Sequence, residues 1–462
     1  MMQNSKKQTD RYKKLTEDKM YPLLWKMAIP AMIGMMVNSV YNMTDVFFVG
    51  LLQRTELVAA VGIVYSFTSL IQAIGFWFGY GSGNSAARKI GSGNVKEAEN
   101  VISVAILLTI IVGAGIMCIG LFFLTPLAEF LGADVSAELM DATIPYLRIT
   151  LISVPVMLAA NVLYNVLRLQ GGARDSMLGM LTGMVLNIIL DPILILGFHM
   201  GVSGAAIASL FGQIGGLIFL IVCAGRNGNV SGNLKAMAFK AVYVREILIG
   251  GAPNFARQGI SSVAMVLLNQ AAGRYGECGV AGTTVALRVI SLVYALVIGF
   301  GQGYQPICLI NYGAGKVERV KEGFYKALLT MTVFLSAAAV ILFLRVENVV
   351  QLLTQDEEAI RVAIDILKAQ CLIFPFMGYY ILIGMFLQNT GRFGLATLVT
   401  VAEDGLFLIP ATFLMPALWG YNGFVWCKSI AGIAAFLFSL VLGVQVLKGM
   451  ISERSLKWKS MC

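Results

Sequence analysis

Histidine is nearly absent from this chain, which has a single one, His199, among 462 residues. A metal centre or catalytic site built on two or more imidazoles is therefore excluded. The chain also lacks a phosphate-binding GxxxxGK[ST] loop, because GAGKV at 313–317 has neither the upstream glycine nor the hydroxyl. We expect no ATP hydrolysis, and we interpret His199 as a loop residue rather than a proton relay.

Charged residues are scarce, at 13%, whereas 58% of the residues are hydrophobic and the mean hydropathy is +0.79. This composition does not fit a water-soluble surface. The seven cysteines are scattered without a CxxC pair, so they are interpreted as buried apolar side chains rather than disulfides or metal ligands. The first apolar run lacks a clear cleavage site and is predicted to be an uncleaved membrane span.

Long apolar runs recur along the whole chain, and each can cross about 30 Å of hydrocarbon as a helix. They show no period of two and are too long for barrel strands. The sequence therefore predicts an all-α integral membrane protein with twelve transmembrane helices. The predicted spans lie near residues 24–50, 56–80, 98–124, 139–161, 174–197, 202–223, 247–272, 281–303, 325–344, 363–386, 394–415 and 421–446.

The 34 Lys and Arg residues are distributed unevenly between the two sides of the membrane. All but nine of them fall in the two tails, the start of the first span and the loops after even-numbered spans. The positive-inside rule then places both termini in the cytoplasm, as in a multi-pass protein of the bacterial cytoplasmic membrane. The net charge of +9 is thereby explained as a topology signal, and we expect no nucleic-acid partner.

The chain repeats itself at an offset of about 220 residues. Because each half contains an even number of spans, the halves are predicted to be parallel six-helix bundles related by a pseudo-twofold axis along the membrane normal. The predicted parts are a cytoplasmic N-terminal tail (1–20), an N-terminal bundle (21–224), a cytoplasmic connector (225–245), a C-terminal bundle (246–447) and a cytoplasmic C-terminal tail (448–462). Matched pairs include Pro30 and Pro253, Gly50 and Gly273, Pro155 and Pro375, Pro192 and Pro410, and Gly204 and Gly423.

Ionisable groups at mid-membrane depth are costly, by about 2.5 to 3.5 kcal/mol on insertion scales, and few occur here. Asn38, Asn42 and Asp45 recur at i, i+4 and i+7 and form one polar stripe on the first span. Asn187 and Asp191 repeat this arrangement on the fifth span. The two carboxylates are predicted to hold a proton or to supply oxygens to Na⁺. The alternative is that they are helix-packing polar groups or lie near the outer interface.

Two further features concern these acids. Pro192 follows Asp191 directly and is expected to loosen the helix there, because proline lacks a backbone donor. At the repeat offsets, Asp45 corresponds to Leu268 and Asp191 to Ile409. A purely architectural pair should be present in both halves, so the asymmetry favours a cation site confined to the first bundle.

The second half carries Arg257, Glu403 and Asp404 instead. Arg257 lies 12 residues after Arg245, and Glu403 lies 11 residues after Arg392, so both are placed roughly 16 to 18 Å deep. Opposite charges at one depth predict an ion pair between Arg257 and Glu403. It would either lock the second bundle or take part in substrate binding.

Methionines on the fifth span offer a further candidate site. Met177, Met180 and Met184 share one helix face and could line an adaptable cavity for apolar ligands, or contact lipid and core.

Three segments carry a resemblance to a known family: SVYNMTDVFFVG, LRLQGGARDSM followed by LNIILDPILILGF, and GQGYQPICLINYGAGK. The sequence resembles the multidrug and toxic compound extrusion (MATE) family, in its MepA-like branch, over residues 20–450. The resemblance implies two six-helix bundles in a V-shaped arrangement. It also implies secondary active export of cationic amphipathic compounds, by antiport with H⁺ or Na⁺ through alternating access.

The resemblance also implies roles for residues. Cation-coupling residues would be Asp45, Asn42, Asn187 and Asp191, with Asp45, Asn187 and Asp191 as candidate ligands of Na⁺. Some relatives have an acid on the seventh helix, where this chain has Arg257 instead. The chain would be a monomer and not an enzyme, with no cofactor besides the coupling ion, and with cationic amphipathic molecules and the lipid bilayer as partners. Residues assigned to the substrate cleft are Asn38, Tyr41, Met184, Arg257, Glu403 and Asp404.

Two other functions are alternatives to multidrug export. One is a flippase of lipid-linked saccharides from the same superfamily, although such relatives commonly have additional spans and more cations in the cleft. The other is a membrane-embedded enzyme, which would need paired catalytic acids or histidines at one interface.

Overall fold

The structure, a computed structural model, describes residues 2–235 and 237–459, with the backbone alone described at residues 2–5, 38–46 and 448–459. The described elements are helical, because a helix satisfies its own backbone hydrogen bonds within a membrane. The first half of the chain contains α1 (Met2–Glu17), α2 (Met20–Gly50), α3 (Thr55–Gly91), α4 (Val95–Phe122), α5 (Leu124–Phe130), the 3-10 helix η1 (Ala133–Val135), α6 (Ala137–Leu169), α7 (Ala173–Asp191), the π-helix η2 (Pro192–Gly197) and α8 (Gly201–Ala224).

The second half of the chain is helical in the same way. Its elements are α9 (Ala241–Gly273), α10 (Gly276–Gly313), α11 (Val317–Gln351), α12 (Glu357–Cys371), α13 (Phe374–Asn389), α14 (Phe393–Val401), the π-helix η3 (Ala402–Leu408) and α15 (Ile409–Lys459).

Twelve spans can be assigned to these helices. Within the described residues, nine helices are long and apolar enough to cross a membrane, and α12 and α13, bent by 63°, together give a tenth span. Phe393–Leu447 is one of the nine, but its 55 residues break at Gly420, where φ is 57° and ψ is −135°, so it forms two spans. The 33-residue α9, whose charged side chains lower its hydropathy, is the twelfth. The expected all-α fold with twelve transmembrane helices is confirmed.

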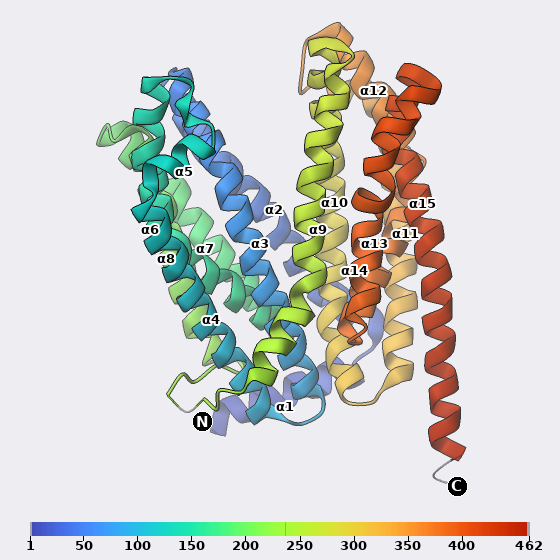
Figure 1. The fold of residues 1–462 in the computed structure, drawn as a ribbon. Coiled ribbons are helices and arrows are strands. Elements are labelled where there is room, and N and C mark those ends of the chain that lie inside the picture. The colour runs from blue at the N-terminus through green and yellow to red at the C-terminus, as the bar shows by residue number, and fades with distance from the viewer. Residues whose placement is uncertain (1, 236, 460–462) are drawn as a thin grey trace. The chain divides into compact units, whose positions relative to one another are not determined.

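The chain packs as two compact units whose boundaries lie inside helices. Unit 1 comprises Met1–Phe255 and Gln302–Gly323, and unit 2 comprises Ala256–Gly301 and Phe324–Cys462. Unit 1 therefore contains the first six spans together with the beginning of α9 and the end of α10, whereas the sequence repeat divides the chain at the connector 225–245. Figure 1 shows α1 at the lower end of the bundle that α2 to α8 form.

Close backbone contacts explain why the beginning of α9 belongs to unit 1. A Cβ on Gly81 of α3 would overlap the carbonyl of Ile247, and a Cβ on Gly251 of α9 would overlap that of Trp77. The indole nitrogen of Trp77 also donates a hydrogen bond of 2.7 Å to the carbonyl of Leu248. Because only glycine permits such an approach, these positions fasten α9 to α3.

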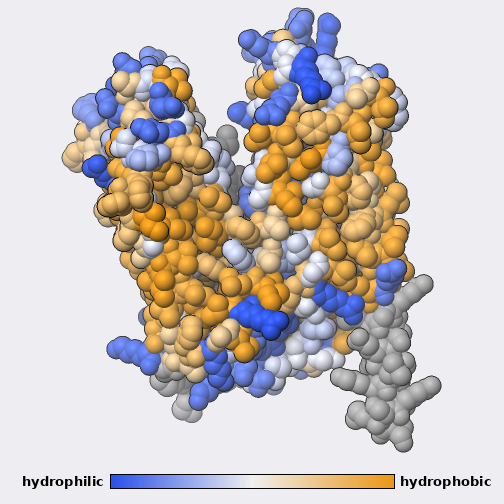
Figure 2. All heavy atoms as spheres, viewed as in Figure 1, coloured by the Kyte–Doolittle hydropathy of each residue, from blue (hydrophilic) through white to orange (hydrophobic). Residues whose placement is uncertain are grey.

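The surface of each unit matches a membrane protein. On the face shown in Figure 2, hydrophobic residues cover the middle of each unit, and hydrophilic residues gather at its two ends. This is the distribution expected when the middle faces acyl chains and the ends face water.

Candidate functional site

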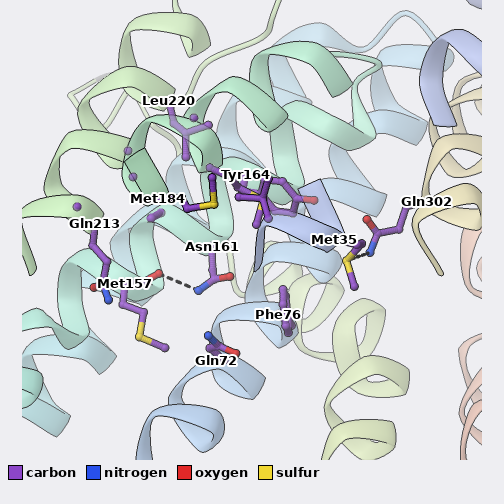
Figure 3. Close-up of a pocket in the computed structure, with 17 residues that line it drawn as sticks. Met35, Gln72, Phe76, Met157, Asn161, Tyr164, Met184, Gln213, Leu220 and Gln302 are labelled. Atoms are coloured by element: carbon purple, nitrogen blue, oxygen red, sulfur yellow. Dashed lines mark hydrogen bonds between the residues drawn. The ribbon is translucent and has the colours of Figure 1, made fainter. Parts of the chain in front are cut away.

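Unit 1 contains a cavity of about 140 Å³ between α2, α3, α6, α7, α8 and the end of α10. The described residues that line it are uncharged and mostly apolar, and they include four methionines (Figure 3). A cavity of roughly 150 Å³ holds one benzene ring, so this one can accept an aromatic group of a larger ligand. The lining methionines are Met35, Met157, Met180 and Met184.

The polar lining of this cavity consists of amides and one phenol. Asn161 donates through Nδ2 to the carbonyl of Met157 at 3.0 Å, and Gln302 donates through Nε2 to the hydroxyl of Tyr80 at 3.0 Å. Among the residues that the structure describes, the buried side-chain oxygens of Gln213 and Gln302 accept no hydrogen bond. The amides around the cavity, drawn in Figure 3, therefore retain hydrogen-bonding capacity that the described residues do not use.

Asn187 and Asp191 lie on α7 and are brought together by the helix. Both residues are 0% exposed. The Asn187 Nδ2 donates to Asp191 Oδ1 at 3.3 Å and to Ser209 Oγ on α8, also at 3.3 Å. Burial penalises an ionised carboxylate, so this acid needs either a proton or a cation. Carboxylate and amide oxygens are suitable ligands for a hard cation.

Glycines set the distance between α7 and α8 at this point. A Cβ on Gly212 of α8 would lie 2.7 Å from the carbonyl of Gly183 and 3.3 Å from the Cβ of Asn187. Small residues at such positions let membrane helices pack closely. Gly183 and Gly212 also line the cavity, so Asn187 lies directly beside it.

The α-helix ends at Asp191 and continues as the π-helix Pro192–Gly197. Proline has no backbone N–H for the helical ladder, and its ring crowds the preceding turn. The helix is therefore widened immediately after the acid, and π-helical turns occur frequently at functional sites.

Five other residues were predicted for this site. Met184 lines the cavity. Asn38, Tyr41, Asn42 and Asp45 lie on α2, and their side chains lie outside the described residues. Their parts in a cation site and in the cleft therefore remain predictions.

Unit 2 contains a different cluster of charged groups. Glu403 and Asp404 lie in the π-helix η3, and the Lys428 ammonium of α15 is 3.7 Å from one carboxylate oxygen of each. The hydroxyl of Ser261 on α9 donates to Asp404. Glu403 is 6% exposed, and the Lys428 side chain is 15% exposed. The half-buried Lys428 thus neutralises two acids in part and holds α15 to η3.

The predicted ion pair between Arg257 and Glu403 is wrong. Within the described part of the chain, the cation found within 4 Å of Glu403 is Lys428, and Arg257 makes no ion pair. Counting residues along two helices gives the depth of a side chain, but it does not give the helix face from which that side chain projects.

Sequence reasoning missed Lys428 and Ser209 as site residues, although the repeat relates them. Gly204 matches Gly423, and Ser209 and Lys428 each lie five residues after these glycines. The same position therefore holds a hydroxyl beside Asn187 in unit 1 and an ammonium in unit 2.

Arg168, in the LRLQGG segment, was also missed. It is 1% exposed, and its guanidinium donates to Gln305 Oε1 and Asn165 Oδ1, both at 2.9 Å, and to the carbonyl of Gln302 at 3.2 Å. It also lies 5.1 Å from the centre of the Tyr80 ring. These contacts fasten the end of α10 to α6 and explain why residues 302–313 belong to unit 1.

Comparison with known proteins assigns the chain to a family. The MatE family model matches residues 30–193 and again residues 253–414. The multidrug export protein MepA of Staphylococcus haemolyticus (strain JCSC1435) is 28% identical over 428 residues, which cover 92% of this chain and 94% of that protein. MepA of Staphylococcus aureus (strain MSSA476) is 28% identical over 420 residues, which cover 90% and 92% respectively.

Solved structures have the same fold. A crystal structure of MATE in complex with MaL6 has a TM-score of 0.89 at 25% identity and covers 95% of this chain and 99% of that chain. A MOP superfamily transporter from Pyrococcus furiosus, described as having a binding pocket of reverse polarity, has a TM-score of 0.84 at 26% identity, with coverage of 93% and 97%. Because the family model matches both halves of the chain, the protein belongs to the multidrug and toxic compound extrusion (MATE) family, in its MepA-like branch.

Proposed function

We propose that this protein is a secondary active multidrug efflux transporter that exports cationic amphipathic compounds in exchange for H⁺ or Na⁺ through alternating access. The observation that carries the proposal is the fully buried Asn187 and Asp191 pair beside an uncharged cavity in unit 1. The relatives support it, since they are multidrug export proteins, and one similar structure is that of a multidrug resistance MATE transporter.

The coupling ion binds at Asp191 because a carboxylate with no exposure needs its charge neutralised. Asn187 contributes an amide oxygen, and Asp45 and Asn42 of α2 complete the donor set. Either H⁺ or Na⁺ satisfies such a site. When the ion leaves, the ionised carboxylate attracts a cationic substrate, and this competition for one negative charge produces exchange.

The cavity of unit 1 receives the apolar part of the substrate. Its methionines adapt to ligands of different shape because the thioether chain is flexible and polarisable. The buried side-chain oxygens of Gln213 and Gln302 accept no hydrogen bond within the described residues, and rotation of these side chains would offer them to the N–H groups of a protonated drug. Among the described lining residues there is no cation to hold a pyrophosphate, which disfavours a flippase of lipid-linked saccharides.

Unit 2 has a supporting part in this proposal. Lys428 supplies one permanent positive charge to the two acids Glu403 and Asp404, and this charge is not exchanged during transport. Arg257, with Asn38 and Tyr41, is assigned to the substrate cleft.

The setting of the transporter follows from its charge distribution. We place it as a monomer in the bacterial cytoplasmic membrane, with both termini in the cytoplasm. We expect the two halves of the sequence repeat, 21–224 and 246–447, to move relative to one another during alternating access, with the connector 225–245 joining them.

Transport by the purified protein in liposomes tests the proposal. An imposed pH gradient and, separately, an imposed Na⁺ gradient are expected to drive ethidium export by the unmodified protein through one of the two ions. Asp191→Asn and Asp45→Asn should each abolish driven export while inserting normally, because a neutral side chain enters lipid more easily. The exposed Asp134→Asn is the matched control. Full activity of both variants would contradict the assignment.

A further inference from the structure

A second cavity of unit 1, of about 770 Å³, lies between α1, the beginning of α2, the beginning of α7 and the connector. Its described lining contains five cationic and two acidic side chains, which leaves a net charge of +3. This charge repels the cationic compounds of the proposed function, so the cavity requires another kind of ligand. The cations are Lys7, Arg11, Lys14, Lys26 and Arg174.

A hydrogen-bonded network fixes one wall of this cavity. Arg11 lies 3.7 Å from Asp175 and donates to the carbonyl of Asn227 and to the side chain of Asn229. Asn229 donates in turn to Asp175 at 2.9 Å. The network holds α1 against α7 and the connector, and it neutralises Arg11 within the protein.

The other four cations are available to an anion. Within the described residues, none of Lys7, Lys14, Lys26 and Arg174 forms an ion pair, and all four are exposed. The remaining acid of the lining is Asp10. Several cations around one cavity favour a group with several anionic oxygens, such as a phosphate.

The rest of the lining indicates where this anion is attached. Met27, Pro30 and Leu178, which are half-buried, contribute apolar surface to the same cavity. Tyr21 and Trp25, each 41% exposed, lie at the start of α2, the helix whose Leu23, Lys26 and Met27 line the cavity. Aromatic side chains at the end of a membrane span are typical of the headgroup level. The cavity is thus basic and apolar at once, at the depth where a phospholipid has its phosphate and the start of its acyl chains.

We propose that this cavity binds the phosphate of an anionic phospholipid. Lys14, Lys26 and Arg174 hold the phosphate, and Met27, Pro30 and Leu178 contact the first acyl carbons. Inorganic phosphate shares the anionic chemistry but would leave the apolar lining unused. The inference concerns lipid binding and does not depend on which compounds the protein exports.

Binding of phosphatidylglycerol to the full-length protein in detergent tests this site, with phosphatidylcholine and inorganic phosphate as separate probes. We expect the protein to prefer phosphatidylglycerol over phosphatidylcholine. The triple variant Lys14→Gln, Lys26→Gln, Arg174→Gln should weaken that binding by about fivefold for each cation removed. The matched control is Lys13→Gln, Lys96→Gln, Lys235→Gln, which removes three exposed cations that do not line the cavity.

Each outcome decides the question. Loss of binding in the cavity variant alone supports the lipid site. If inorganic phosphate binds with the same dependence on the three cations and displaces phosphatidylglycerol, the anion site stands with free phosphate as its source. Equal binding by both triple variants overturns the proposal. Should the cavity variant fail to fold, the unmodified protein still decides, because phosphatidylglycerol preference that persists at high salt also contradicts an electrostatic site.

Discussion

Units 1 and 2 each bury an acid, Asp191 or Glu403, where a helix changes to π-helical geometry, but different groups contact the acid. In unit 1, Asp191 immediately precedes the π-helix and contacts Asn187. In unit 2, Glu403 and Asp404 lie within the π-helix, and Lys428 lies 3.7 Å from each. One unit thus contains a fixed cation that contacts its acids.

The repeat makes this difference informative. Ser209, beside Asn187, is equivalent in the repeat to Lys428. The same helix position therefore carries a hydroxyl in unit 1 and an ammonium in unit 2. A fixed ammonium cannot itself be exchanged for an ion from solution. We infer that ion exchange belongs to unit 1 and that unit 2 is held together by its own charges.

Installing the cation of unit 2 in unit 1 should have the largest effect. Ser209→Lys places an ammonium near Asp191, where it competes with the coupling ion. We expect it to weaken the binding free energy of that ion by about 3 kcal/mol, or roughly 100-fold in affinity. Ion-driven ethidium export should fall to background. Ser209→Met, of similar length and without charge, is the control, and its activity in the same liposome assay should exceed that of Ser209→Lys. Equal activity of the two variants would show that charge at this position is unimportant.

Removing the cation of unit 2 should mainly affect stability. Lys428→Met leaves the buried Glu403 and the half-buried Asp404 without a counter-charge, which we expect to cost about 3 to 5 kcal/mol of unfolding free energy. Thermal unfolding in detergent measures this loss. Adding Glu403→Gln and Asp404→Asn should recover much of it, because the uncompensated charges are then removed. No loss in the single variant would mean that the ion pairs contribute little.

A smaller effect is expected from the hydroxyl that contacts the same cluster. Ser261→Ala removes a hydrogen bond to the Asp404 carboxylate, and hydrogen bonds to charged groups contribute about 1.5 to 3 kcal/mol. The midpoint of thermal unfolding should decrease accordingly. Ser262→Ala is a matched control, because the Ser262 hydroxyl donates to the backbone of its own helix. A larger loss in the control would exclude the contact with Asp404 as the cause.

The smallest effect should come from Arg257. It forms no ion pair with Glu403, so the losses from Arg257→Gln and Glu403→Gln should add to within about 0.5 kcal/mol in the double variant. A double-mutant cycle on thermal stability measures the coupling. A large coupling energy would instead indicate that Arg257 and Glu403 interact, as the sequence predicted.

Hydropathy predicted the spans well because crossing a membrane imposes both length and composition. The predicted span at 363–386 corresponds to two helices, α12 and α13, bent by 63° near Pro375, and hydropathy does not report such a bend. The predicted end of the eighth span at residue 303 is ten residues short of Gly313, the end of α10. That extension mixes polar and apolar residues and packs within unit 1, where Arg168 donates a hydrogen bond of 2.9 Å to Gln305.

The candidate site was less predictable than the fold. Asn187 and Asp191 were found because their spacing places them one turn apart on a single helix, and a helix fixes local neighbours. Pairs between helices depend on rotation about each axis, which explains the error at Arg257. Lys428 was overlooked as a partner of the acids because it was considered only as one of the cations that indicate topology. The repeat places it at the position equivalent to Ser209.

Ion exchange by the purified protein tests the central claim most directly. Proton release and Na⁺ displacement can be measured as ethidium is added to the unmodified protein, to Asp191→Asn and to the triple variant Lys428→Met, Glu403→Gln, Asp404→Asn. If unit 1 holds the exchange site, one of the two ions is released by the unmodified protein and by the triple variant, and Asp191→Asn releases neither. Normal release from Asp191→Asn together with loss of release from the triple variant would place the exchange site in unit 2 and contradict the account.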